Sequence, residues 1–230
     1  LIFRWNAESA ARMTELQAGP VDGIDHHGAL AFEVIANNPD LQLLPREGAN
    51  VLYLGLNNTI APFDNLLVRQ AVAHSIDKQR LVDSFYPPGS SVATQFMPTS
   101  IFGFTPEVEE FPFDPAMAMQ LLDESGVDLP NTVELNYRDV VRGYIPQPSV
   151  IAADFQAQLN SIGDGAYFNV TPAPQESTTF LDNASAGNLA MFLLGWGADY
   201  PDATNFLDFH FGTGANDSFG DKFEEITTPL

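Results

Sequence analysis

The spacing of apolar residues divides the chain into alternating strands and helices. In one predicted helix, apolar side chains recur at positions 68, 71, 72 and 76, and in the longest apolar run they follow one another without interruption from 189 to 194. The predicted strands cover residues 1–5, 21–24, 41–44, 51–57, 133–137, 166–170 and 189–194. The predicted helices cover 7–18, 29–35, 64–76, 114–126, 149–162 and 175–186, and two more begin at the capping residues Asp77 and Asp202.

The order of these elements predicts the fold class. From Asp114 onward helices and strands alternate, which favours a mainly parallel sheet covered by helices. Residues 189–194 lack polar alternation, as is typical of a central strand buried on both faces. Five prolines between 86 and 112 predict a long irregular segment, and long irregular segments often serve function. The sequence therefore predicts an α/β fold.

Composition narrows the possible partners. The chain has 230 residues, 45% of them hydrophobic, and a net charge of −21, with nine Lys and Arg residues against thirty carboxylates. It can bury a core, but its field repels phosphate backbones and anionic headgroups, so we expect no nucleic-acid partner. The absence of cysteine excludes disulfides and thiolate metal sites. No stretch approaches the ~18 apolar residues of a membrane span.

The strongest candidate for chemistry follows the last predicted strand, where the sequence reads Gly-Trp-Gly-Ala-Asp-Tyr-Pro-Asp over residues 195–202. Ligands of open α/β sheets bind beyond the carboxyl ends of strands. Gly195 and Gly197 allow a close backbone approach, and Trp196 and Tyr200 offer rigid aromatic walls around the acid Asp199. This arrangement predicts a site for a cationic or amine-bearing ligand.

The same residues also have a purely structural interpretation. Trp196 could belong to the core, and Asp199 could cap a turn. For Asp202 we favour the structural role, as the cap of the helix that follows.

Enzymatic and metal-binding alternatives rest on weaker patterns. Asp199, Asp202 and Asp208 could supply the carboxylate pair of a hydrolase, although spacing in the sequence does not fix their separation. His26, His27 and His210 suggest metal binding, but they show no recognisable ligand spacing. No familiar catalytic motif occurs, so we expect no catalysis, no metal and no cofactor.

Three segments of the chain, residues 57–77, 113–126 and 195–207, together resemble a known family, the extracellular solute-binding proteins of family 5. These are receptors of ABC importers for peptides, nickel and some sugars. The resemblance implies a periplasmic-binding-protein type II-like α/β fold without either end of the full receptor. Residues 1–57 would be the end of the first lobe with its crossing strand, and 58–230 would be the second, C-terminal lobe.

The resemblance also implies roles for single residues. The run from Trp196 to Tyr200 is similar to a loop in which oligopeptide receptors pair an aspartate, here Asp199, with the α-ammonium group of a peptide. Arg142 and Tyr144 resemble a position where dipeptide receptors place an arginine against the carboxylate of the peptide. Arg142 could equally be a solvent-facing cation of a loop.

From the resemblance we expect a monomeric receptor at the periplasmic or extracellular face of the membrane, with its signal or lipid anchor upstream of residue 1. It would capture a short peptide between two lobes and deliver it to a membrane permease. The alternatives are a hydrolase that uses Asp199 and Asp202, and a receptor for a metal chelate that uses His26, His27 or His210.

Overall fold

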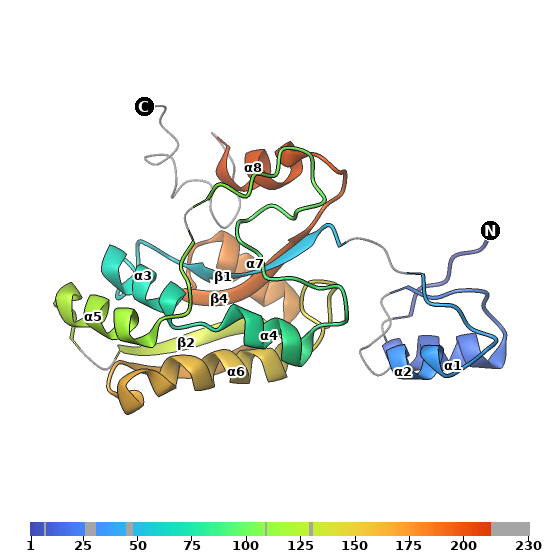
Figure 1. Ribbon diagram of the computed structural model, residues 1–230, viewed down its shortest axis with the longest axis horizontal. Helices are drawn as coiled ribbons and strands as arrows, with labels where there is room; N and C mark the ends of the chain where they lie inside the picture. Colours follow the sequence, from blue (N-terminus) through green and yellow to red (C-terminus); the bar gives the residue numbers. More distant parts are fainter. Residues whose placement is uncertain (7, 26–30, 45–47, 109, 129–130, 213–230) are drawn as a thin grey trace.

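The computed structural model describes residues 1–6, 8–25, 31–44, 48–108, 110–128 and 131–212. From Asn50 onward these residues build one four-stranded sheet with helices on both faces (Figure 1). The strands are β1 (Asn50–Leu56), β2 (Asn131–Arg138), β3 (Phe168–Gln175) and β4 (Met191–Gly197), in the spatial order β1-β4-β2-β3. Strands β2, β3 and β4 are parallel, which confirms the predicted parallel arrangement, and β1 is antiparallel to β4.

The helices lie on both faces of the sheet, so the sheet separates two layers of core. One face of the sheet is covered by α3 (Leu66–His74), α4 (Lys78–Phe85), α5 (Pro115–Ser125) and α6 (Pro148–Ser161), whose apolar side chains join those of the strands in the largest core cluster. The opposite face packs on α7 (Ser177–Ser185). The short 3-10 helix η1 (Ile162–Gly165) follows α6, and α8 (Ala203–Phe211) follows β4.

Helix α8 packs against the proline-rich segment. Within residues 87–108 and 110–114 the backbone forms no helix or strand, as predicted. Met97 and Ile101 of this segment share a small core with Phe206 of α8 and Val51 of β1. The segment thereby fixes α8 against the end of the sheet.

Capping residues begin several helices where the sequence predicts them. The side chain of Asp77 accepts a hydrogen bond from the Arg80 amide at 2.9 Å, and that of Asp114 accepts one from the Met117 amide at 3.0 Å. For α3 the predicted cap, Asp64, is wrong. Asn65 takes that place because the helix begins at Leu66, and its side chain accepts from the Leu67 amide.

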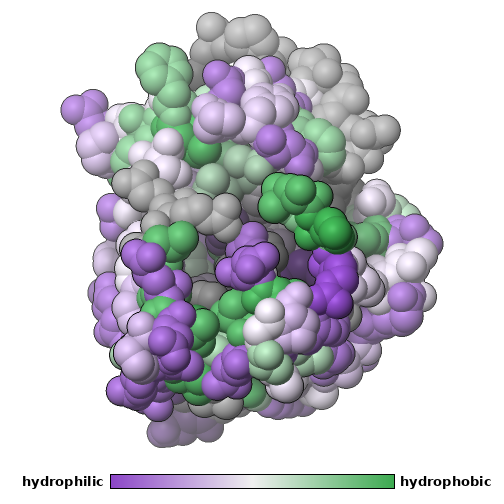
Figure 2. Space-filling model, turned by 90° about the vertical axis from the view of Figure 1, so that its right-hand side faces the viewer, coloured by the Kyte–Doolittle hydropathy of each residue, from purple (hydrophilic) through white to green (hydrophobic). Residues whose placement is uncertain are grey.

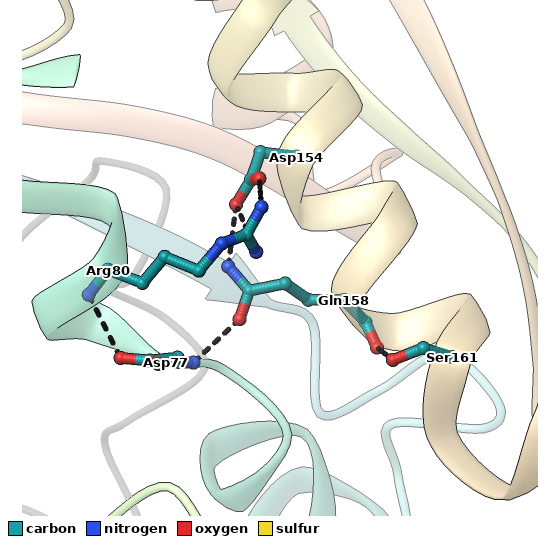
Figure 3. Close-up of polar contacts among 5 residues, drawn as sticks. All are labelled: Asp77, Arg80, Asp154, Gln158 and Ser161. Atoms are coloured by element: carbon teal, nitrogen blue, oxygen red, sulfur yellow. Dashed lines mark hydrogen bonds and ion pairs between the residues drawn. The ribbon is translucent and has the colours of Figure 1, made fainter. Parts of the chain in front are cut away.

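A polar cluster joins α4 to α6 (Figure 3). The buried carboxylate of Asp154 forms an ion pair with Arg80 and accepts a hydrogen bond of 2.6 Å from Gln158 Nε2. Gln158 Oε1 in turn accepts from the Asp77 amide at 2.7 Å, and the Gln158 carbonyl accepts from Ser161 Oγ at 2.7 Å. These bonds seat the first turn of α4 on α6.

Residues 1–6, 8–25 and 31–44 lie apart from the sheet in Figure 1 and contain α1 (Ser9–Ala18) and α2 (Ala31–Ala36). Their buried side chains, Met13, Ala31 and Ile35, form a separate small cluster. The predicted strands 1–5, 21–24 and 41–44 are wrong, because no neighbouring strand pairs with them in the described part of the chain.

The first residues of the chain show why an apolar pattern alone does not make a strand. Leu1, Ile2, Phe3 and Trp5 are exposed, so the apolar pattern that predicts a strand is present without a sheet to receive it. Figure 2 shows the side of the molecule that lies to the right in Figure 1. Hydrophobic residues are exposed there among hydrophilic ones.

Strand β1 corresponds to the predicted crossing strand of residues 51–57. Strand β1 pairs with β4 along its whole length, from Asn50 opposite Gly197 to Leu56 opposite Met191. Its side chains at 52, 54 and 56 pack on the largest core cluster, which is the physical reason why β1 joins this sheet. The sheet thus includes the predicted crossing strand, and the assignment of residues 1–57 and 58–230 to two lobes stays a prediction.

Candidate functional site

The candidate site lies where β4 ends and the chain passes through residues 198–202 into α8. Asp202 has the structural role favoured from the sequence. Its side chain accepts a hydrogen bond of 3.0 Å from the Thr204 amide and caps α8. This bond from the backbone, with a second one from the Thr204 hydroxyl, lowers the pKa of Asp202 below its usual value.

Asp199 differs from Asp202 in that its carboxylate is exposed and has no hydrogen-bond or ion-pair partner among the described residues. Tyr200 beside it is half exposed, and Gly197 is exposed as well. A carboxylate of this kind, flanked by an aromatic ring and an open backbone, is available to a cation from outside the chain.

The indole of Trp196 has one face in an aromatic cluster. It stacks on Phe209 with ring centroids 4.5 Å apart at 27°, and it meets the ring of His210 edge-on at 4.7 Å. Trp196 is only partly buried, so it belongs to the core and to the surface at once. The two interpretations from the sequence, a core residue and a wall of a site, are therefore compatible.

A buried asparagine that the sequence interpretation missed holds this loop together. The side-chain oxygen of Asn205 accepts a hydrogen bond of 3.0 Å from Trp196 Nε1 and another of 3.1 Å from the Asp199 amide. Asn205 is 5% exposed and lies in the first turn of α8, three residues after the cap Asp202. The sequence contains a signal for this role, because asparagine is unfavourable within a helix unless its side chain has a specific partner.

The second predicted segment, with Arg142 and Tyr144, lies against the same end of the sheet. The backbones of Arg142 and Ile145 exchange two hydrogen bonds of 3.1 Å and form a tight turn. The ring of Tyr144 packs over Gly195 of β4, where a side chain would overlap it. The structure thus brings the two predicted segments together.

Within this turn the two predicted residues differ in exposure. Tyr144 is only 8% exposed, its hydroxyl accepts a 2.7 Å hydrogen bond from Arg138 Nη2, and its carbonyl accepts one of 2.8 Å from the Tyr86 hydroxyl. Burial raises the pKa of Tyr86, so this donor stays protonated. Arg142 is exposed, and among the described residues its guanidinium reaches only the neighbouring Val141 carbonyl at 3.5 Å. Tyr144 supports the turn from inside, and Arg142 presents a cation outside it.

A separate polar cavity of about 260 Å³ lies at the start of β4 and contains none of the predicted site residues. Two of its lining amides bond to each other, since Gln175 donates to Asn136 at 2.6 Å, and Gln175 also accepts at 3.1 Å from Asn183, which lies outside the lining. This cavity lies at the other end of β4 from the predicted site residues.

The histidines do not assemble a metal site in the described part of the chain. His210 is buried, and its Nδ1 lies 2.9 Å from the Phe206 carbonyl. His26 and His27 lie outside the described residues. No group of three or more His, Asp or Glu side chains that could hold a metal ion occurs within the ranges that the structure describes.

No helix among the described residues is both long enough and apolar enough to cross a bilayer.

Comparison with known proteins gives consistent matches. Residues 1–218 match the family described as bacterial extracellular solute-binding proteins, family 5 Middle. Heme-binding protein A of Haemophilus influenzae is 32% identical over 202 residues, which are 87% of this chain and 36% of the relative. Di/tripeptide-binding protein 1 of Pseudomonas aeruginosa is 29% identical over 225 residues, 98% of this chain and 41% of the relative.

A solved structure gives the same result for the fold. The dipeptide-binding protein of Pseudoalteromonas sp. SM9913, in complex with Met-Leu, superposes with a TM-score of 0.78 at 28% identity, over 88% of this chain and 39% of that one. The expected periplasmic-binding-protein type II-like α/β fold, present in part, is confirmed. The chain spans about two fifths of the length of these relatives.

Proposed function

The chain belongs to the bacterial extracellular solute-binding proteins of family 5, and on this basis we propose that it forms part of a receptor that captures a small solute for an ABC importer. The solute is bound between two lobes, passed to a membrane permease, and left chemically unchanged. The receptor works as a monomer at the periplasmic or extracellular face of the membrane. The names of its relatives, which include periplasmic and transport proteins, support this assignment.

A short peptide is the solute that the site favours. The observation that carries this proposal is the exposed carboxylate of Asp199, which has no partner among the described residues and lies beyond the carboxyl end of β4. The α-ammonium group of a peptide is a compact cation that such a carboxylate can bind through charge-assisted hydrogen bonds. Trp196 and Tyr200 would line the space beside it.

Arg142 is the proposed partner of the other end of the peptide. A guanidinium binds a carboxylate through two parallel hydrogen bonds, and the guanidinium of Arg142 is exposed on a turn that Tyr144 fixes to β4. An acid on one loop and a base on the neighbouring turn match the two charged ends of a zwitterionic peptide.

No observation favours the hydrolase alternative. A carboxylate pair needs an acid whose pKa is raised, whereas the pKa of Asp202 is lowered by its capping bonds. Heme is an alternative ligand to a peptide, because one relative is named for heme binding. Heme is an anionic chelate without an ammonium group.

Isothermal titration calorimetry on the complete receptor distinguishes these ligands. The titrants are the dipeptide Met-Leu, its N-acetylated form and heme. The proposal predicts that Met-Leu binds and that N-acetylation weakens binding on the order of thirtyfold or more, because it removes the cation that Asp199 pairs with. Binding of heme in preference to Met-Leu, or equal binding of the two peptide forms, would contradict it.

A further inference from the structure

We propose that Asn205 is the positioning residue that sets the geometry of the ligand site, by tying the Trp196 indole and the Asp199 backbone to one oxygen atom. This inference rests on the proposed function, since it assigns a role in the binding of the peptide amine. Asn205 itself need not touch the ligand. It fixes the two groups that do.

The geometry of the oxygen carries the argument. An amide oxygen has two lone pairs, and the Asn205 Oδ1 atom uses both, for Trp196 Nε1 at 3.0 Å and for the Asp199 amide at 3.1 Å. One donor belongs to the aromatic wall and the other to the acid. A shift of the Asn205 side chain would therefore move both parts of the site together.

The asparagine is itself firmly held. Asn205 is 5% exposed, and its backbone N–H donates a hydrogen bond to the Asp202 carbonyl at 3.1 Å. The next residue, Phe206, is fully buried. Asn205 lies in α8, which is held in place by the buried side chains of Phe206 and His210. A buried acceptor on a rigid helix is well suited to orient a loop.

Other bonds hold the loop at residues on either side of Asp199. Between β4 and α8, the Ala198 amide donates to the Ala49 carbonyl at 2.8 Å, and the Asp202 amide donates to the Tyr200 carbonyl at 2.9 Å. The bond to Asn205 is the one that restrains the Asp199 backbone while leaving its carboxylate without a partner in the described chain. This combination, a fixed backbone and a free charge, lowers the cost of ordering the loop when a ligand binds.

The first test follows the indole N–H of Trp196 by ¹⁵N NMR of the complete receptor, with the resonance assigned by its loss in Trp196→Phe. In the unmodified receptor we expect slow exchange with water, because the proton is bonded to Asn205. Asn205→Ala should shift this resonance and accelerate its exchange, while Asn205→Asp, which keeps an acceptor oxygen, should retain slow exchange. Fast exchange in the unmodified receptor would overturn the inference even if the alanine variant fails to fold.

The second test measures affinity for Met-Leu by calorimetry. Asn205→Ala should weaken binding about tenfold, or ~1.4 kcal/mol, through loss of orientation. Asp202→Ala is the matched control, because it removes the cap of the same helix and leaves the Asn205 oxygen in place. It should lower the stability of the receptor but change affinity less than about threefold.

These outcomes separate the inference from the proposed function. If the unmodified receptor does not distinguish Met-Leu from N-acetyl-Met-Leu, the proposed function fails, whatever Asn205 does. If it distinguishes them and Asn205→Ala binds Met-Leu within about twofold of the unmodified receptor, or if Asp202→Ala weakens binding as much as Asn205→Ala, Asn205 is not a positioning residue.

Discussion

The ring of Tyr144 lies directly on Gly195, so the turn that carries Arg142 is held against the strand that carries Trp196. The contact is possible only because Gly195 has no side chain. An added Cβ atom would overlap the ring and would lie 2.6 Å from the carbonyl oxygen of Val51 in the neighbouring strand. This close approach joins the two halves of the candidate site.

Substitution of Gly195 by alanine tests this contact. Gly195→Ala should lower the free energy of unfolding by ~1–3 kcal/mol, because overpacking forces the ring or the backbone of β1 to move. Gly197→Ala on the same strand is the control, since its nearest neighbour would be Asn50 Cβ at 3.8 Å, an ordinary contact. Urea denaturation measures both. Equal stability of the two variants would show that Tyr144 does not pack on Gly195.

The ion pair between Arg80 and Asp154 predicts a second stability difference. Arg80→Ala leaves the carboxylate of Asp154, 7% exposed, without its cation, and should cost about 1–3 kcal/mol. The exposed pair of Arg4 and Glu15, whose side chains are 55% and 40% exposed, is the control. Arg4→Ala should cost less than ~1 kcal/mol. Denaturation curves in which both variants lose the same stability would contradict this interpretation.

The Asp202 cap predicts a pH dependence. Because the folded-state pKa lies below the usual aspartate value of 3.8, the charged cap contributes its full stability above that value and loses it as the pH falls through the lower, folded-state pKa. Asp202→Ala should therefore be less stable than the unmodified receptor at pH 7, and the difference should shrink in strongly acidic solution. Thermal melts from pH 7 to pH 2 measure it, and a difference that stays constant over this range would exclude the capping role.

The sequence predicts most of the α/β section because its signals are local. The cap Asp114, the apolar strand before Gly195 and the helix of residues 149–162 each carry their own pattern, and all three are found in the structure. The apolar run of residues 1–5 carries a strand pattern as well, but a strand forms only where another strand pairs with it, and the described chain provides none.

The part of the candidate site that has a local sequence signal is predictable from the sequence. The segment around Asp199 stands out because glycine, aromatic and acidic residues follow a buried strand directly. The contact of Tyr144 with Gly195 and the two bonds of Asn205 depend on how separate elements meet in space. Neither pattern is visible in residue spacing.

The charge of Asp199 is the central element of the proposed function, and Asp199→Asn tests it most directly. The substitution keeps the size of the side chain and an acceptor oxygen but removes the charge. Loss of one partner of a desolvated ion pair costs ~2–5 kcal/mol, whereas loss of an exposed loop acid costs ~0–1 kcal/mol. Asp202→Asn is the matched control, because it removes the same charge three residues away while asparagine remains a good helix cap.

The decisive measurement is therefore calorimetric titration of Met-Leu into the complete receptor and into these two variants. The proposed function predicts that Asp199→Asn lowers affinity on the order of thirtyfold or more, while Asp202→Asn stays within about threefold of the unmodified receptor. If Asp199→Asn also binds Met-Leu within about threefold of the unmodified receptor, Asp199 does not pair with the ammonium group of the ligand and the assignment is wrong.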